Sequence, residues 1–396
     1  MDKLTVQLSQ LMAQRSALSF SFYCHKENNV DNTRKLLTAV RLMQNENDNS
    51  CLVSAQNTDQ IIAQLHGEHE YSDDDLALIL SLKLIIAPQM QAELLPALFT
   101  SKHHQLQMLS LAVAQLLGDK LSFTFDFGLD AIASNVFYRT IEPNELSRQQ
   151  ALFQQIVFYL YSRKTLNEFL NVMAPEYKDG ANRKTNKIRL SPLSWLTIDV
   201  LSDNYIDVQI LTEQFIEQDL LQTRLFNCYI TSLSEHDITQ LVNYLSVDEA
   251  FIPSIIHAMA LSGYAKFIPF LAQYLQQPDY VLDAYKGLRL LLGDKLDAII
   301  PLNVQFNSDQ YERQKDLVYY GAKILNAWQN RLPILEIAFK QDEHDNRLLN
   351  GEALTAKQID KVLKSGSQWH RYVAMLHKQH QCDEPYVHHV NGLEVS

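Results

Sequence analysis

The chain has 396 residues, and 46% of them are hydrophobic, which is enough to bury a sizeable core. Its 34 Lys and Arg residues against 46 Asp and Glu give a net charge of −12, which disfavours nonspecific binding to nucleic acid or anionic membranes. It has only 11 glycines and 11 prolines, which disfavours a turn-rich β-sandwich or barrel.

The cysteines and the N-terminus predict the cellular compartment. The four cysteines are widely separated and form no Cys-x-x-Cys pair, which is typical of free thiols in a reducing environment. The first residues lack the cationic start, continuous apolar core and cleavage site of a signal peptide. No apolar run approaches the roughly 20 residues that a membrane helix needs. We therefore expect a cytoplasmic protein.

Residues 1–71 predict an N-terminal helical region. An amphipathic helix is expected within residues 1–25, a second helix over 32–43 and a polar loop over 44–49.

Residues 72–121 predict a helical repeat block. Ser72 and Asp75 have the spacing of a capping box, with an acid in place of the usual Glu or Gln, and they open a strongly apolar run. Two further apolar faces follow, and the block ends in the hexapeptide LLGDKL at residues 116–121.

Residues 122–245 predict an irregular, mostly helical middle region with a long loop at 175–192. The pattern leaves open whether this region continues a repeat or is an inserted domain. Its loop contains the chain's one basic cluster, made of Lys178, Arg183, Lys184, Lys187 and Arg189. The cluster fits either a phosphate or acidic-partner contact, or a solvated loop; the absence of interleaved aromatic residues favours the loop. Lys184 and Lys187 are kept as candidate partner contacts.

Residues 246–396 predict a second repeat block with a C-terminal helical cap. Ser246 and Glu249 have capping spacing before an apolar helix that Gly263 is expected to close in a left-handed conformation. Pro269 fits the first turn of the next helix. A third helix is closed by Gly293 within a second LLGDKL, at residues 291–296.

The two LLGDKL hexapeptides predict an internal repeat. They lie 291 − 116 = 175 residues apart, and each follows three helical runs. Short helical pairs cannot bury their apolar faces alone and must stack on neighbours. The predicted fold is therefore all-α, a HEAT-like α-solenoid of stacked helical hairpins with an irregular middle region.

The last part of the chain supplies further candidates for partner binding. The run LPILEIAF at residues 332–339 fits a strand or a helical turn equally well. Thr355 and Gln358 predict another helix start. Trp369, His370 and Arg371 are of types enriched at binding hot spots. We expect Trp369 to favour core packing and Arg371 to be the better exposed contact.

The sequence contains no strong catalytic or metal motif. His66 and His69 are spaced like half a zinc site, but HExxH is absent and the intervening Gly67 disfavours a helix. The Glu235-His236-Asp237 triplet is better explained as a helix start capped by Ser234. We predict no catalytic residues, no cofactor and no metal.

The C-terminal third resembles an uncharacterised proteobacterial family of HEAT-like repeat proteins. The resemblance covers residues 253–390 and, in general pattern only, 75–121; this chain departs from it at Asn350 and Trp369. The matching positions are Trp328, Arg347, Leu348, Leu349, Gly351, Leu354, Thr355, Gln368 and Arg371. Genes of that family lie near type VI secretion clusters, so the resemblance implies a bacterial cytoplasmic role beside that machine. It adds Arg347 and Gly351 to the candidate partner contacts, and it carries no established activity.

Together these patterns predict a non-catalytic protein-binding scaffold, namely an adaptor, effector chaperone or immunity protein associated with type VI secretion. The expected partner is another protein, either basic or a secreted effector, because the chain itself is acidic. The alternative is a nucleic-acid-acting HEAT-like repeat enzyme such as a DNA glycosylase, which needs a cationic, aromatic-lined groove.

Overall fold

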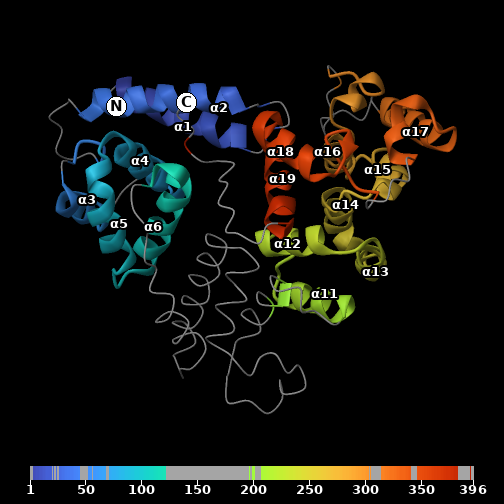
Figure 1. The fold of residues 1–396 in the computed structure, drawn as a ribbon, viewed down its shortest axis with the longest axis horizontal. Coiled ribbons are helices and arrows are strands. Elements are labelled where there is room, and N and C mark those ends of the chain that lie inside the picture. Colours follow the sequence, from blue (N-terminus) through green and yellow to red (C-terminus); the bar gives the residue numbers. More distant parts are fainter. Residues whose placement is uncertain are drawn as a thin grey trace, which may run out of the picture. The chain divides into compact units, whose positions relative to one another are not determined.

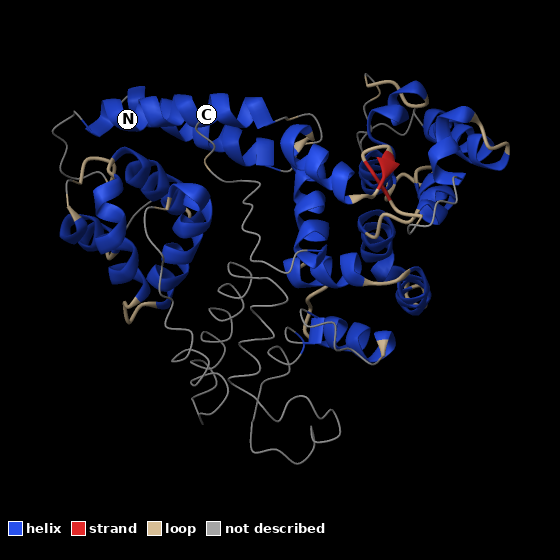
Figure 2. Ribbon diagram, viewed as in Figure 1, coloured by secondary structure: helices blue, strands red, loops and turns tan. Residues whose placement is uncertain are grey.

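The computed structural model shows an all-α protein. Two short strands are the exception among the described residues (Figure 2): β1 (Leu348–Leu349) and β2 (Glu352–Ala353) pair antiparallel. The structure describes residues 3–19, 21, 24, 26–44, 52–55, 57–67, 71–121, 196, 199–200, 207–302, 304, 314–339, 346–381 and 393. The loop predicted at 175–192, with its basic cluster, lies outside these residues.

The chain divides into two compact units. Unit 1 is Met1–Ser194 with Cys382–Ser396, and unit 2 is Trp195–Gln381. Unit 2 is thus inserted in the sequence of unit 1. This division joins the predicted regions 1–71 and 72–121 and starts unit 2 within the predicted middle region. The finer four-part division stays a prediction.

Unit 1 is built from pairs of packed helices (Figure 1). Helix α1 packs along α2, α2 packs on α4, and α6 packs on both α4 and α5. The elements are α1 (Lys3–Ser19), α2 (Lys26–Gln44), α3 (Thr58–Leu65), α4 (Asp73–Ile86), the 3-10 helix η1 (Pro88–Met90), α5 (Gln91–Phe99), α6 (His104–Leu117) and the 3-10 helix η2 (Gly118–Lys120).

Helix α4 packs on both α2 and α6, and it is buried from Leu76 to Leu84 because this part is almost entirely apolar. Its predicted start is confirmed: the Asp75 amide donates to Ser72 Oγ at 3.2 Å. The buried ammonium of Lys83 donates to the main-chain oxygen of Val53 at 2.8 Å, which compensates the polar group inside the core.

Unit 2 continues the same style of packing with more helices. Helix α14 packs on α12, α13 and α16, α15 packs on α16 and α17, and α19 packs on α12 and α18. The helices are α11 (Val208–Glu217), α12 (Arg224–Ser232), α13 (Glu235–Leu245), α14 (Ile252–Leu261), α15 (Ile268–Tyr274), α16 (Val281–Leu292), α17 (Gln314–Gln329), α18 (Ala356–Ser365) and α19 (Gln368–Gln381). The 3-10 helices are η5 (Glu249–Phe251), η6 (Ala265–Phe267), η7 (Gly293–Ala298) and η9 (Pro333–Phe339).

The two LLGDKL segments fold alike. Block 1 consists of α4, η1, α5, α6 and η2, and block 2 consists of α14, η6, α15, α16 and η7; in each, the third helix packs on both earlier ones. In each, the helix ends at the second leucine. Gly118 and Gly293 then take φ of 50° and 53° and a 3-10 turn follows. The sequence repeat is therefore also a structural repeat.

Several local predictions can now be judged. Gly263 has a φ of 81° as expected, and Thr355 caps α18. The prediction for Ser246 is wrong: its hydroxyl donates to Val242 O at the end of α13, and Asp248 caps η5 instead. The undecided run LPILEIAF forms the 3-10 helix η9.

No single helix among the described ranges combines the length and apolarity of a membrane span. One bent pair, Asp73–Ile86 with Pro88–Phe99, passes by length and composition, with 116° between its halves.

Candidate functional site

The predicted partner contacts that the structure describes all lie in the last part of unit 2, at the β1–β2 hairpin and on helix α19. Arg347, at the start of the hairpin, forms an isolated antiparallel bridge with Tyr264 in the turn after α14. The hairpin therefore reaches helix ends that are far away in the sequence.

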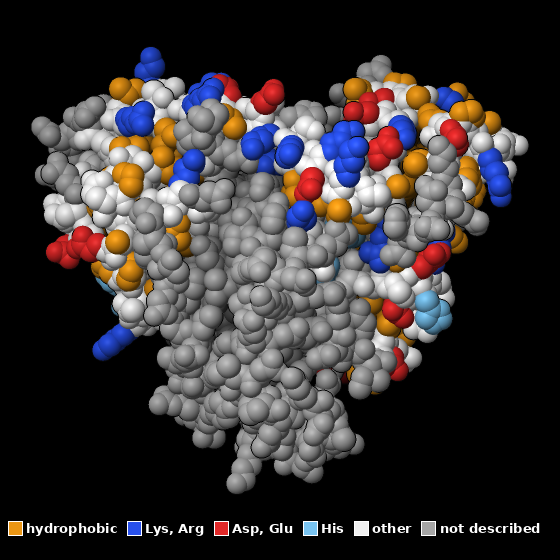
Figure 3. Space-filling model, in the orientation of Figure 1, with side chains coloured by type: hydrophobic (Ala, Val, Ile, Leu, Met, Phe, Trp, Pro, Cys, Tyr) orange, Lys and Arg blue, Asp and Glu red, His pale blue; other side chains and the backbone are white. Residues whose placement is uncertain are grey.

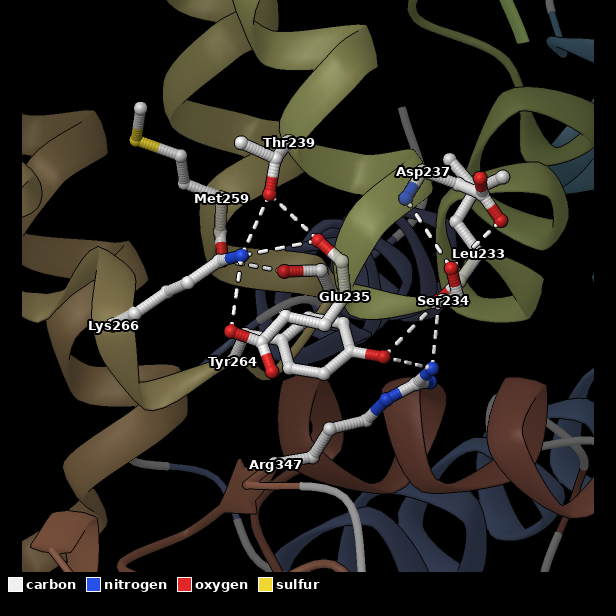
Figure 4. Close-up of polar contacts among 10 residues, drawn as sticks. Leu233, Ser234, Glu235, Asp237, Thr239, Met259, Tyr264, Lys266 and Arg347 are labelled. Carbon is white, nitrogen blue, oxygen red and sulfur yellow. Dashed lines mark hydrogen bonds and ion pairs between the residues drawn. The ribbon is translucent and has the colours of Figure 1, made fainter.

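The Arg347 side chain is directed inward and is 9% exposed (Figure 4). Its guanidinium donates to the main-chain oxygens of Thr231 at 2.9 Å and Leu233 at 2.6 Å, and to the Tyr264 hydroxyl at 2.6 Å. Helix C-termini carry carbonyls without intrahelical partners, and a cation there also favours the helix dipole. Arg347 therefore closes the end of α12.

Lys266 lies near the same aromatic ring. Its ammonium donates to the Thr239 hydroxyl at 2.6 Å and to the main-chain oxygen of Glu235 at 3.0 Å, and pairs with the Glu235 carboxylate at 3.1 Å. The Lys266 ammonium lies 5.8 Å from the Tyr264 ring centre, and the Arg347 guanidinium lies 4.5 Å from it. These contacts connect α12, α13, η6 and the hairpin (Figure 4).

Gly351 is buried because the hairpin turn lies directly against the end of α16. The amides of Asn350 and Gly351 donate to Leu290 O at 3.0 Å and Leu291 O at 2.8 Å. A Cβ on Gly351 would approach Leu292 O to 2.7 Å, and its φ of 78° also favours glycine. The position therefore requires glycine for close packing.

His370 and Arg371 are buried in the corner between α18 and α19. The His370 Nε2 donates to Arg289 O at 3.1 Å, and its Nδ1 accepts from the Ser367 hydroxyl at 2.7 Å. Arg371 is 0% exposed and donates to Leu363 O at 3.0 Å and Gln368 Oε1 at 2.6 Å. The expectation that Arg371 is an exposed contact is wrong, because it satisfies the carbonyl end of α18.

Trp369 is half-buried and stacks on Tyr372, with ring centres 5.4 Å apart. Lys184 and Lys187 lie outside the described residues, so their assignment as partner contacts stays a prediction. The other predicted contacts serve the packing of unit 2. The side chains of Arg347, His370 and Arg371 bond to main-chain oxygens, and Gly351 allows the hairpin to approach α16.

A part-buried polar layer joins α12, α14 and α19. His257 Nε2 donates to Asn227 Oδ1 at 2.6 Å, and Asn227 Nδ2 donates to the Tyr372 hydroxyl at 3.1 Å. Burial lowers the pKa of His257 to about 4, although part of the residue remains exposed. Burial, followed by the positive charge of Arg347, lowers the pKa of His377 well below its ordinary value. Both imidazoles are therefore neutral at neutral pH.

The structure brings together two histidine motifs that the sequence separates. His66 at the end of α3 and His103 at the start of α6 have ring centres 4.7 Å apart. Within the described ranges, however, no group of three or more His, Cys, Asp or Glu side chains is placed to hold a metal.

Exposed apolar side chains on α15, α16 and α17 were missed by sequence reasoning. Phe270, Leu282 and Tyr319 keep 48%, 45% and 56% of their surface exposed. Since α15 packs on both α16 and α17, the three helices that carry them are neighbours. Figure 3 shows hydrophobic side chains between charged ones in this part of unit 2. The spacing of apolar residues predicts the apolar face of a helix, but it does not predict which of these residues stay exposed to solvent.

Comparison with known proteins gives no relative. No known family, no curated protein and no solved structure matches this chain.

Proposed function

We propose that the protein is a non-catalytic protein-binding scaffold whose helical blocks stack as a HEAT-like solenoid. The observation that supports this is the set of exposed apolar side chains on α15, α16 and α17. This set consists of Phe270, Leu282, Val318 and Tyr319. Solvated aromatic side chains on neighbouring helices are favourable contacts for another protein.

The internal use of polar groups is consistent with this proposal. The arginines and histidines of the C-terminal hairpin and α19 bond to main-chain oxygens and neighbouring side chains inside unit 2. These hydrogen bonds satisfy the carbonyls at helix ends, and they therefore stabilise the helical structure of unit 2. A rigid helical support suits binding through a broad face, because little ordering cost is added when the partner arrives.

The partner we propose is a basic protein or a secreted effector. A chain with net charge −12 attracts basic partners, and this attraction weakens as salt screens it. The resemblance of the C-terminal third to HEAT-like proteins encoded near type VI secretion clusters is the reason for including effectors. The role would then be that of an adaptor, effector chaperone or immunity protein.

The test is affinity capture from the source cells, followed by reconstitution with the purified partner. Wild-type protein is compared with the double variant Phe270→Glu, Tyr319→Glu. The matched control is Leu42→Glu on α2 of unit 1, whose side chain is 50% exposed. We expect the double variant to weaken partner binding at least about tenfold, since a charge replaces an aromatic side chain at each of two proposed contacts. Unchanged affinity would reject Phe270 and Tyr319 as partner contacts.

The nucleic-acid alternative has its own experiment. A gel shift with double-stranded DNA at physiological salt should show no complex if the scaffold proposal is right. Tight binding there would instead favour the glycosylase-like enzyme, because nonspecific DNA affinity at that salt needs several phosphate contacts.

A further inference from the structure

We propose that helix α19 is an acid-sensitive latch, which leaves α12 when His377 takes up a proton. The latch is a conformational device within unit 2. It rests on the contacts between α19 and α12 and on the charges around this buried histidine, and it is independent of the proposed scaffold function.

Helix α19 is joined to α12 by polar contacts. The Asn227 amide donates to the Tyr372 hydroxyl at 3.1 Å, and His380 Nε2 donates to the main-chain oxygen of Cys228 at 3.0 Å. His380 Nε2 also lies 3.0 Å from the hydroxyl oxygen of Thr231. Tyr372 and His380 are eight residues apart, which is slightly more than two helical turns. The polar contacts therefore run along one side of α19.

His377 lies on α19, three residues before His380, and its side chain is only 4% exposed. Burial, followed by the charges of Arg347 and His380, lowers the pKa of His377 well below its ordinary value. Arg347 and His380 meet at the end of α12, because Arg347 donates to Thr231 O at 2.9 Å and His380 contacts the hydroxyl of the same residue. A proton on His377 would therefore add a positive charge beside basic groups and away from water.

The two helices that pack most closely on α19 do not compensate such a charge. The titratable side chains of α12 are Arg224, Cys228 and Tyr229, and those of α18 are Lys357, Asp360, Lys361 and Lys364. Asp360 is the one carboxylate in this set, and it pairs with Lys378 at 2.8 Å on an exposed edge. Burial raises the pKa of the Cys228 thiol to about 11, so this thiol is uncharged at neutral pH.

The carboxylates of the neighbouring elements act on other groups. Glu352 of the β1–β2 hairpin pairs with Lys295 at 3.2 Å. Asp283 of α16 raises the pKa of His257 on α14, whereas the charges that act on His377 both lower its pKa. A proton on His377 is therefore compatible with water around it but not with the closed position of α19.

The direction of the pH dependence follows from this difference. A histidine in water takes up a proton near pH 6.5, whereas the buried His377 does so only at a much lower pH. The open state of α19 therefore gains the proton first as pH falls, and opening becomes more favourable below about pH 6.5. At pH 5 one such histidine shifts the opening equilibrium about thirtyfold. Opening would uncover the side of α12 that Tyr372 and His380 contact.

The first experiment is amide hydrogen exchange on the full chain at pH 7 and pH 5, corrected for the intrinsic pH dependence of exchange. We expect exchange in α19 to rise about thirtyfold at pH 5 and to stay faster than in α16 at both pH values, as a local opening requires. His377→Gln should remove this rise. The matched control is His236→Gln, at an exposed position on α13, which should keep it. Equal rates in α19 and α16, or the same rise in His377→Gln, would overturn the proposal.

The second experiment places the charge at this position without acid. His377→Lys should open α19 at pH 7, with exchange at least as fast as in the wild type at pH 5, while α16 keeps its protection. His377→Asn is a second neutral variant and should behave as His377→Gln does. If α19 of the lysine variant stays as protected as in the wild type, the latch is wrong. Loss of protection in α16 together with α19 would also contradict it, because His377 would then support the whole of unit 2.

Discussion

Blocks 1 and 2 have the same order of helices and the same glycine turn, yet their helix ends are closed differently. In block 1, the amide of the Gln91 side chain donates to Leu84 O at 3.1 Å and Lys120 O at 3.2 Å. In block 2, the equivalent residue, 175 positions later, is Lys266, which is directed to α13 instead. The β1–β2 hairpin there lies against the ends of α14 and α16. The two blocks therefore share the positions at which their helices end, whereas the residues that contact those ends differ between them.

The largest effect is expected from Gly293→Ala compared with Gly118→Ala. Both glycines have positive φ, but a Cβ at Gly293 would overlap Asn350, with that residue's carbonyl carbon at 2.8 Å. We expect destabilisation of about 4 kcal/mol at Gly293 and about 2 kcal/mol at Gly118. Urea unfolding, with hydrogen exchange to separate the units, measures both. Equal losses would mean that the hairpin adds no constraint at Gly293.

Arg347→Met removes the hydrogen bonds between the hairpin and the end of α12. The described part of block 1 has no equivalent of these bonds. The substitution leaves the main-chain oxygens of Thr231 and Leu233 without this donor, and we expect a loss of about 3 kcal/mol. All three tryptophans lie in the sequence of unit 2, so their fluorescence reports its unfolding. Arg347→Lys is the control and should restore less than half, because an ammonium lacks the planar fork. Full restoration by lysine would contradict this explanation.

The two blocks should respond differently to acid. Desolvation lowers the pKa of the partly exposed His257 to about 4, whereas the equivalent residue in block 1 is the fully buried Leu82. The unfolded chain takes up the proton near pH 6.5 and the folded chain only near 4, so stability is lost as pH falls through that window. We expect unit 2 to lose about 2 kcal/mol, after allowing for the partial exposure of His257.

The measurement is urea unfolding of unit 2 at pH 7 and pH 5, followed by tryptophan fluorescence. His257→Asn should remove the part of the pH dependence that this residue causes and leave the part caused by His377, whose lowered pKa acts in the same direction. If the variant and the wild type show the same slope, His257 does not carry the effect.

The smallest effects come from the equivalent pair Gln91 and Lys266. Gln91→Leu removes two buried hydrogen bonds and should cost about 1 to 2 kcal/mol, seen as faster exchange at the ends of α4 and α6. Lys266→Met should cost less than about 1 kcal/mol, because its ion pair with Glu235 is half-exposed. Its effect should be confined to the start of α13. A larger loss at Lys266 would reverse this ordering.

Much of the local structure was predictable from sequence. The helix starts at Ser72 and Thr355 were predicted from the spacing of a cap and the residue three positions later, and the start at Ser234 from the acidic residues that follow it; all three are confirmed. The failure at Ser246 has a simple cause. Its hydroxyl bonds backward to Val242 O, and Asp248, two residues later, supplies the cap. Two neighbouring polar residues compete for the same role, and spacing alone does not decide between them.

The candidate contacts were predicted less well. Trp369 and Arg371 are two residues apart and are of types common at protein interfaces, but Trp369 is half-buried and Arg371 is completely enclosed. A two-residue step on a helix turns the side chain by about 200°, so exposure depends on which neighbouring helices surround it. The exposed Phe270 and Tyr319 were not singled out for the same reason.

The sequence by itself determined the helical class, the positions of the glycine turns and the presence of a repeat, because these follow from short-range spacing and backbone conformation. Only the tertiary structure decided which polar groups are buried and which apolar ones remain in water. Arg347 illustrates the difference: its partners are the ends of helices more than 80 residues earlier in the chain. Hydrogen-bond satisfaction of helix ends is a local requirement, but the donor that meets it is chosen by the fold.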